Sequence, residues 1–158
     1  MAIAEIRGGP LAPEIQGTVL FQDLPGGTMI SVYVTGLPAY QPATSEQAPI
    51  GPFGFHIHEF GNCIVGDPQN PFQAAGGHWN PTREPHGNHA GDLPVLFSNH
   101  GMAQFNFFTD RFQVKDLLDR TVIIHQNPDD YRSQPAGASG KRLACGVINL
   151  CSRVREGH

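Results

Sequence analysis

Short runs of alternating apolar residues, interrupted by glycine and proline, most constrain how this chain can fold. Residues 15–22, 28–35 and 53–60 are runs of this kind, and 19 glycines and 14 prolines are available to end them. Alternation sends successive side chains to opposite faces, which is typical of a strand with one buried face, and frequent turn residues keep each strand short. Four further strands are expected, over residues 93–98, 102–109, 121–126 and 146–154.

Seven or eight short strands predict an all-β chain, folded as an antiparallel sandwich or barrel. Residues 93–98 and 102–109 flank Asn99-His100-Gly101 and are expected to pair as a hairpin. Residues 113–120 fit either one or two turns of helix or another strand. At 158 residues the whole chain, 1–158, is expected to be a single domain.

Two long segments, 61–91 and 127–141, have no strand pattern. Loops of this length usually carry function or are disordered. The first contains a cysteine and several potential metal ligands, so function is the better interpretation for it.

Composition excludes several classes of protein. The net charge of −4 and the lack of a basic run argue against a nucleic-acid partner. No apolar stretch has the length of a transmembrane helix. Residues 1–9 lack the features of a signal peptide, so we expect either a cytoplasmic protein or the mature form of an exported one. Three cysteines allow one bridge and one remaining thiol.

Histidine is concentrated in the middle of the chain, where seven of the eight histidines lie between His56 and His125. His56 and His58 are two apart on an expected strand, so both side chains face the same way. His-x-His alone is weak, because it also occurs by chance on solvated strands. His125 ends another expected strand, and alone it would be interpreted as a buried, hydrogen-bonded histidine.

A second set of ligand-type residues lies in the long loop. It consists of His78, His86, His89 and Asp92, and three nitrogens with one carboxylate oxygen suit tetrahedral zinc. The alternative is a polar, glycine-rich loop with stray histidines. His56, His58 and His125, with His78 as a fourth imidazole, suit Cu(II). A deprotonated His78 could bind both metals, stabilised by two divalent cations.

Five motifs together resemble the copper,zinc superoxide dismutase family. They occur in family order over roughly residues 15–150, and each is modest by itself. They are residues 56–61 (HIHEFG), 76–81 (GGHWNP), 86–93 (HGNHAGDL), 122–125 (VIIH) and 140–148 (GKRLACGVI).

The resemblance implies a role for each matching residue. The copper ligands would be His56, His58, His78 and His125, and the zinc ligands would be His78, His86, His89 and Asp92. Arg142 would draw superoxide to copper, and His78 would release copper on reduction and then carry a proton. Asp129 would be the carboxylate that joins the two sites, and Cys63 would form a disulfide with Cys145, leaving Cys151 free.

The resemblance also implies the fold, the reaction and the partners. The fold would be a flattened Greek-key β-barrel or sandwich, immunoglobulin-like, of about eight antiparallel strands with two long functional loops. The reaction would convert superoxide anion to oxygen and hydrogen peroxide, an antioxidant activity that needs a copper ion and a zinc ion. A homodimer and a copper donor protein are the partners that it suggests.

The sequence leaves two rival functions open, and it departs from the family pattern in a few places. The rivals are a non-catalytic copper-binding relative and a zinc-only structural module. Compared with the animal enzymes, the stretch between His58 and Cys63 is short, and the loop from Asp129 to Arg142 is short and lacks their acidic and lysine cluster. His100 and His158 match no ligand position, and we expect them in a hairpin turn and at a frayed end.

Overall fold

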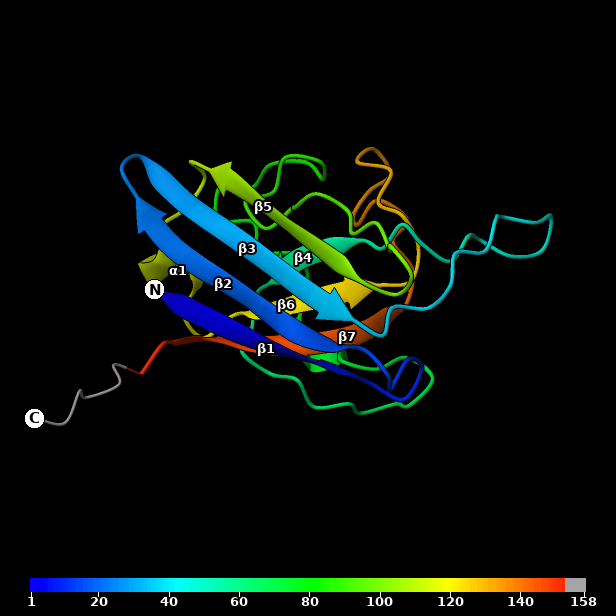
Figure 1. The fold of residues 1–158 in the computed structure, drawn as a ribbon. Helices are drawn as coiled ribbons and strands as arrows, with labels where there is room; N and C mark the ends of the chain where they lie inside the picture. Colours follow the sequence, from blue (N-terminus) through cyan, green and yellow to red (C-terminus); the bar gives the residue numbers. More distant parts are fainter. Residues whose placement is uncertain (153–158) are drawn as a thin grey trace, which may run out of the picture.

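Seven antiparallel strands form one sheet in the computed structural model, which describes residues 1–152 (Figure 1). Their order across the sheet is β4-β6-β7-β1-β2-β3-β5. The only helical elements in the described residues are a short 3-10 turn, Gln73–Ala75, and the helix α1, Val114–Leu117. The strands are β1 (Ala2–Gly8), β2 (Gln16–Leu24), β3 (Gly27–Thr35), β4 (Phe55–His58), β5 (Ala103–Thr109), β6 (Thr121–His125) and β7 (Arg142–Leu150).

The sheet is curled into two layers, with β1, β2, β3 and β5 in front of β4, β6 and β7 in the view of Figure 1. The connections from β3 to β4, from β4 to β5 and from β5 to β6 each cross between the two ends of the strand order. Long returns of this kind between antiparallel strands make a Greek-key arrangement. The expected all-β Greek-key fold is therefore confirmed.

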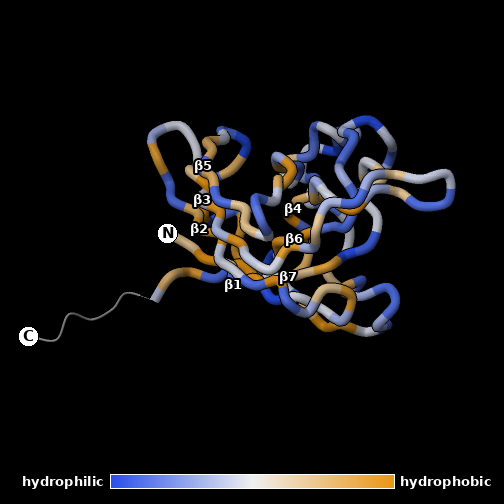
Figure 2. Tube along the Cα trace, turned by 45° about the vertical axis from the view of Figure 1, so that its right-hand side comes forward, coloured by the Kyte–Doolittle hydropathy of each residue, from blue (hydrophilic) through white to orange (hydrophobic). Residues whose placement is uncertain are grey.

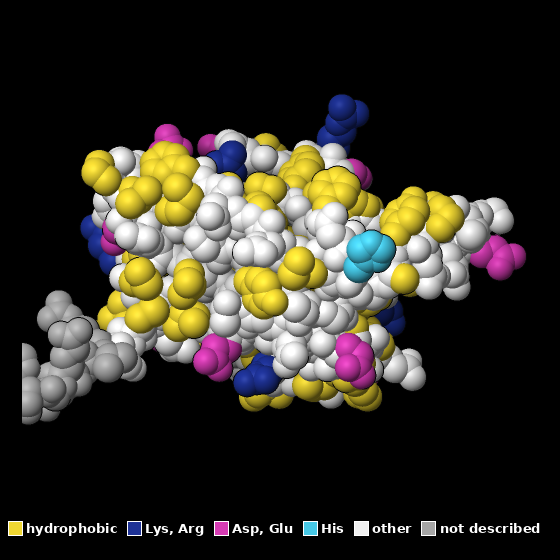
Figure 3. All heavy atoms as spheres, in the orientation of Figure 1, with side chains coloured by type: hydrophobic (Ala, Val, Ile, Leu, Met, Phe, Trp, Pro, Cys, Tyr) yellow, Lys and Arg dark blue, Asp and Glu magenta, His cyan; other side chains and the backbone are white. Residues whose placement is uncertain are grey.

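The core lies between the layers and follows the alternation of the sequence. In β2 and β3 the buried side chains include Val19, Phe21, Ile30 and Val32, and Figure 2 shows hydrophobic colour along the strands and hydrophilic colour in many of the loops. Every residue of β4 and β6 is buried. Some apolar side chains also lie on the outside, and Figure 3 shows several of them on the face over β2, β3 and β5. Within residues 1–152, no helix has the length and apolar character needed to span a membrane.

Two expectations about residues 93–98 need correction, the strand itself and its pairing with residues 102–109. Residues 93–98 do not form a strand, because the ladder contact of this segment is a single isolated bridge between Leu96 and Phe53. Pro94 cannot donate to a ladder, and β5 pairs with β3 instead. The turn alone survives, with hydrogen bonds in both directions between Asn99 and Met102.

The strand β1 was not expected, although Ala2, Ala4 and Ile6 alternate and are buried. Of the two alternatives for residues 113–120, the structure has the helix, α1, with a capping box in which the Gln113 N–H donates to the Asp116 carboxylate at 2.9 Å. The end of the strand expected over 146–154, and His158, lie outside the described residues.

Candidate metal centre

Three of the candidate ligands lie on neighbouring strands. His56 and His58 belong to β4, which pairs antiparallel with β6, and His125 is the last residue of β6. A bulge between Ile124 and His125 re-aims the end of β6. The Nε2 atoms of His58 and His125 lie 3.2 Å apart. Sheet register therefore sets this part of the centre.

His78 lies between two groups of ligand-type atoms. It is bridged to His58 in the backbone, and its ring stacks on that of His56 with 3.9 Å between centroids. Its Nδ1 is 3.0 Å from Asp92 Oδ1. One compact group contains His56, His58, His78 and His125, and another contains His56, His78, His86 and Asp92. The structure thus places both His56 and His78 in both groups, and the predicted zinc ligand His89 in neither.

The remaining candidates converge on the Asp92 carboxylate. His86 Nδ1 lies 3.2 Å from Asp92 Oδ2, and His89 Nδ1 lies 3.3 Å from Asp92 Oδ1. His89 Nδ1 is also 3.4 Å from His78 Nδ1. Three imidazole nitrogens and a carboxylate thus face one another, which is a donor set that suits zinc.

Several buried ring nitrogens of the centre lack a hydrogen-bond partner among the described residues. They are His56 Nδ1, His78 Nε2 and His86 Nδ1. A buried polar atom without a partner is costly and needs an explanation. A metal ion on each side of His78 would supply one, so the donor set fits copper and zinc.

Burial keeps the strand-borne histidines neutral. It lowers the pKa of His58 well below its usual value, with the nearby charges of His125, His78 and Arg142 acting in the same direction. Burial likewise lowers the pKa of His125 to about 3. A metal-binding imidazole must be neutral, so the strands present these side chains in the form that binds metal.

Asp129 joins the two groups. Its Oδ2 is 2.6 Å from His56 Nε2, and its Oδ1 is 2.8 Å from His86 Nε2. The Tyr131 N–H also donates to Oδ1, at 2.7 Å. A carboxylate on the outer nitrogen of an imidazole fixes its tautomer and its orientation. Asp130 instead binds Arg132 and Ser133 within its own exposed turn.

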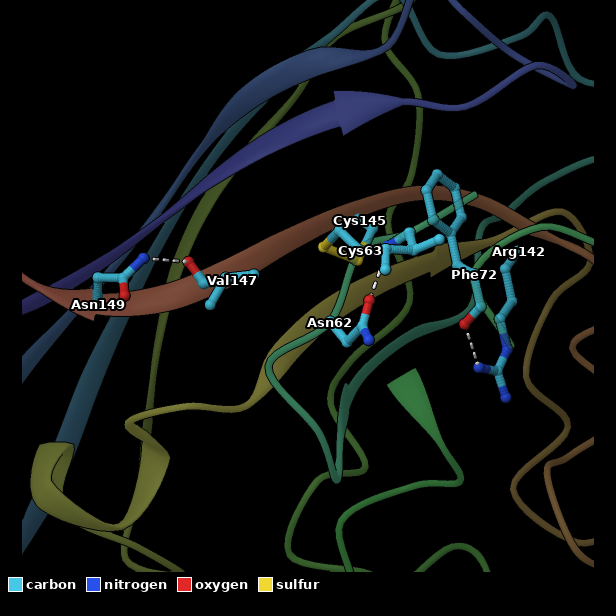
Figure 4. The surroundings of a disulfide bond; sticks show 8 residues. Asn62, Cys63, Phe72, Arg142, Cys145, Val147 and Asn149 are labelled. Atoms are coloured by element: carbon cyan, nitrogen blue, oxygen red, sulfur yellow. Dashed lines mark hydrogen bonds between the residues drawn. A yellow bond between two sulfur atoms is a disulfide. The ribbon is translucent and has the colours of Figure 1, made fainter. Parts of the chain in front are cut away.

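Arg142 borders a hollow of about 300 Å³ that is also lined by His78 and His125. Its Nη1 donates to the Phe72 carbonyl at 2.8 Å (Figure 4). Phe72 has φ 64°, and its buried side chain packs in a small cluster with Ala75, Ile123 and Cys145. A disulfide bond joins Cys145 to Cys63 in the same cluster, and Cys151 is free.

Sequence reasoning missed three residues that support the centre. Phe72 holds Arg142, as above. Gln134 accepts from the His86 N–H at 2.8 Å and donates to the His86 carbonyl at 3.3 Å. Arg111 donates to the His89 carbonyl at 2.9 Å. No local pattern marks these residues, because each contact depends on how distant loops meet.

Known proteins share this pattern. The family model for Copper/zinc superoxide dismutase (SODC) matches residues 15–148. A "Superoxide dismutase [Cu-Zn]" of Deinococcus radiodurans is 39% identical, covering 85% of this chain and 78% of that protein. One of Legionella pneumophila is 35% identical, covering 94% and 90%. A crystal structure of a double mutant of a SOD-like protein from Bacillus subtilis matches with a TM-score of 0.69 and 29% identity, covering 92% of this chain and 95% of the other.

Proposed function

The chain belongs to the copper/zinc superoxide dismutase family, and on this premise we propose which of its residues carry out the dismutation of superoxide. The protein is a superoxide dismutase, an oxidoreductase that uses copper and zinc. Two superoxide anions and two protons become one oxygen and one hydrogen peroxide. Copper, when bound, supplies the one-electron couple between Cu(II) and Cu(I), a role that redox-inactive zinc cannot take.

The proposed copper ligands are His56, His58, His78 and His125. The proposed zinc ligands are His78, His86, His89 and Asp92. The observation that carries this assignment is the position of His78, whose Nδ1 lies 3.0 Å from Asp92 Oδ1 while its buried Nε2 has no hydrogen-bond partner among residues 1–152. A bridging imidazolate explains both facts. His56 also lies in both groups, but its Nε2 is already 2.6 Å from Asp129. Asp129 would orient His56 and His86 from outside the two sites.

Arg142 is the proposed anion-binding residue. Its guanidinium borders the same hollow as His78 and His125, and a fixed cation there would orient a small anion by charge-assisted hydrogen bonds. The Phe72 carbonyl restricts where the guanidinium can lie. His78 lines this hollow too, which supports it as the residue whose Nε2 would hold a proton and pass it to the departing peroxide.

Metal analysis tests the ligand assignment. Protein loaded with both metals should hold one copper and one zinc per chain, because the two four-ligand sets share His78. A reproducible total of one metal per chain would contradict the shared ligand, and a zinc-only chain without dismutase activity would indicate a structural module.

Substitution of Arg142 tests the anion site. Arg142→Ala should lower kcat/KM for superoxide while copper and zinc contents stay unchanged. Arg132→Ala removes the same charge from an exposed position and serves as the control. Loss of copper in Arg142→Ala, or full activity, would remove the proposed role.

The homodimer and the copper donor protein remain predictions. Sedimentation of the loaded protein checks the first. Copper transfer from a donor, followed by a competing chelator, checks the second.

A further inference from the structure

The zinc-side loop closes on itself between His89 and Asp92. The Asp92 N–H donates to the His89 carbonyl at 3.0 Å, and Asp92 Oδ2 accepts from the N–H groups of His89 and Gly87, each at 2.9 Å. These bonds are internal to the loop, and the turn joins β4 only at its end, where the Ile57 N–H donates to the Gly91 carbonyl at 2.9 Å and Asp92 forms an isolated bridge with His56. The side chain of His89 is 9% exposed, against 4% for His78 and 0% for His86.

At the start of the turn, at Asn88 and His89, one side chain from another segment makes the contact. Arg111 lies in the connection between β5 and α1, and its Nη1 donates to the His89 carbonyl at 2.9 Å. Its Nη2 donates to Asn88 Oδ1 at 3.2 Å. We propose that Arg111 is a positioning residue for His89 and sets how long zinc stays in its site. The inference rests on the proposed zinc ligands.

Arg111 also stands beside a separate approach to the zinc side. It lines a hollow of about 420 Å³ together with Asp92, Leu93, Thr109 and Tyr131. The hollow that holds Arg142 and His125 shares no lining residue with it. The zinc side therefore has a hollow of its own, separate from the one that Arg142 and His125 line.

The charge of Arg111 and its positioning role predict opposite changes in the rate of zinc release, so the direction of the change tests the inference. A guanidinium near a bound cation repels it, so charge alone predicts that removing Arg111 would slow the release of zinc. A positioning role predicts the opposite, because a freed turn would let His89 leave the metal. Loss of groups that orient metal ligands typically weakens binding ~10–100-fold, and we expect the lower end because Arg111 holds the backbone rather than the ring.

The experiment measures zinc release into excess chelator from protein loaded with zinc alone. Arg111→Met keeps an apolar side chain and removes the guanidinium group. This variant should release zinc ~10-fold faster than the unchanged protein. Arg83→Met is the matched control, since Arg83 lies in the same loop and its side chain makes no hydrogen bond or ion pair among the described residues. It should release zinc at the original rate or more slowly.

Thermal unfolding of the metal-free proteins separates positioning from general support. The two variants should unfold at the same temperature while their zinc release rates differ. Equal release rates, slower release from Arg111→Met, or a lower unfolding temperature that accounts for its faster release would each overturn the inference. Failure of the unchanged protein to bind zinc would instead overturn the proposed function.

Discussion

The two sides of the metal centre are held in place by different means. His56, His58 and His125 stand on β4 and β6, whose register and buried side chains fix them together with the barrel core. His86, His89 and Asp92 stand in a loop whose end is hydrogen-bonded to β4 at Gly91. Elsewhere, single polar side-chain contacts from other segments hold these ligands. These contacts come from Asp129, Gln134 and Arg111.

This difference predicts how each side will fail. Paired strands are held by many hydrogen bonds and by a packed core. A single hydrogen bond contributes only about 0.5–1.5 kcal/mol to stability. Single polar substitutions should therefore weaken zinc binding and spare the copper side. The copper side should be vulnerable instead to conditions that act on all its buried histidines together.

Acid is the largest such perturbation. The pKa values of His58 and His125 lie below the ordinary 6.5 in the folded protein, largely because of burial, and that of His125 is about 3. The unfolded chain therefore takes up protons first as the pH falls below 6.5. The free energy of unfolding should drop by about 1.4 kcal/mol for each group and pH unit.

Urea unfolding of the metal-free protein at pH 7.5 and pH 5.5 measures this loss. The pKa of His56 is lowered by burial as well. His125→Asn removes one of these groups, so the free energy of unfolding of the variant should depend less steeply on pH. The same free energy of unfolding at both pH values would contradict the burial of neutral histidines.

Asp129→Ala should give the next largest effect, and on the opposite side of the centre. Both His56 and His86 lose a partner on Nε2, but β4 still holds His56, whereas His86 keeps only its loop and the Gln134 contact to its backbone. We expect zinc affinity to fall ~10–100-fold with a smaller change for copper. Chelator competition measures both affinities.

Asp130→Ala is the matched control for that substitution. Asp130 caps an exposed turn and contacts neither histidine through a hydrogen bond. A larger zinc loss in Asp130→Ala than in Asp129→Ala would show that the bridge had been placed on the wrong carboxylate.

Gly137→Ala should displace the same bridge without removing it. A Cβ built on Gly137 would overlap Asp129 Oδ1 and lie 2.5 Å from His86 Nε2. The loop must move or the carboxylate must turn, so zinc affinity should fall by about tenfold, the lower end of the range for lost orienting partners. Gly26→Ala has a similar left-handed φ, 86° against 68°, but open space around its Cβ. Equal zinc affinity in both variants would mean that the overlap is relieved harmlessly.

The strands and the loop also differ in how far the sequence predicts them. The alternation in residues 15–22 and 28–35 predicted β2 and β3, because burial of one face is a local property of the sequence. β1 carried the same signal in smaller residues and was missed. Residues 93–98 were wrongly predicted as a strand, since apolar character alone does not reveal that Pro94 prevents continuous pairing.

The candidate ligands were found because their residue types and spacings carry the chemistry. The residues that hold their backbone were not found. Arg111 is 22 positions from His89, and Gln134 is 48 positions from His86. Such a contact exists only once the barrel has brought the two loops together, and an arginine or a glutamine in a loop has no periodicity or motif to indicate it.

Gln134→Ala should give the smallest loss of zinc affinity, and it is the most sensitive test of the difference between the loop-held zinc side and the strand-held copper side. Its side chain holds the backbone of His86 through two neutral hydrogen bonds, at 2.8 and 3.3 Å, and leaves the imidazole to Asp129. A net contribution of about 1 kcal/mol corresponds to roughly a fivefold loss of zinc affinity, with copper affinity unchanged. Gln47→Ala is the control, because the Gln47 side chain is exposed and makes no hydrogen bond within residues 1–152. Chelator competition on the two variants measures the difference. If copper affinity fell as far as zinc affinity, the loop contacts would support both metals alike, and the division between a strand-held and a loop-held side would be wrong.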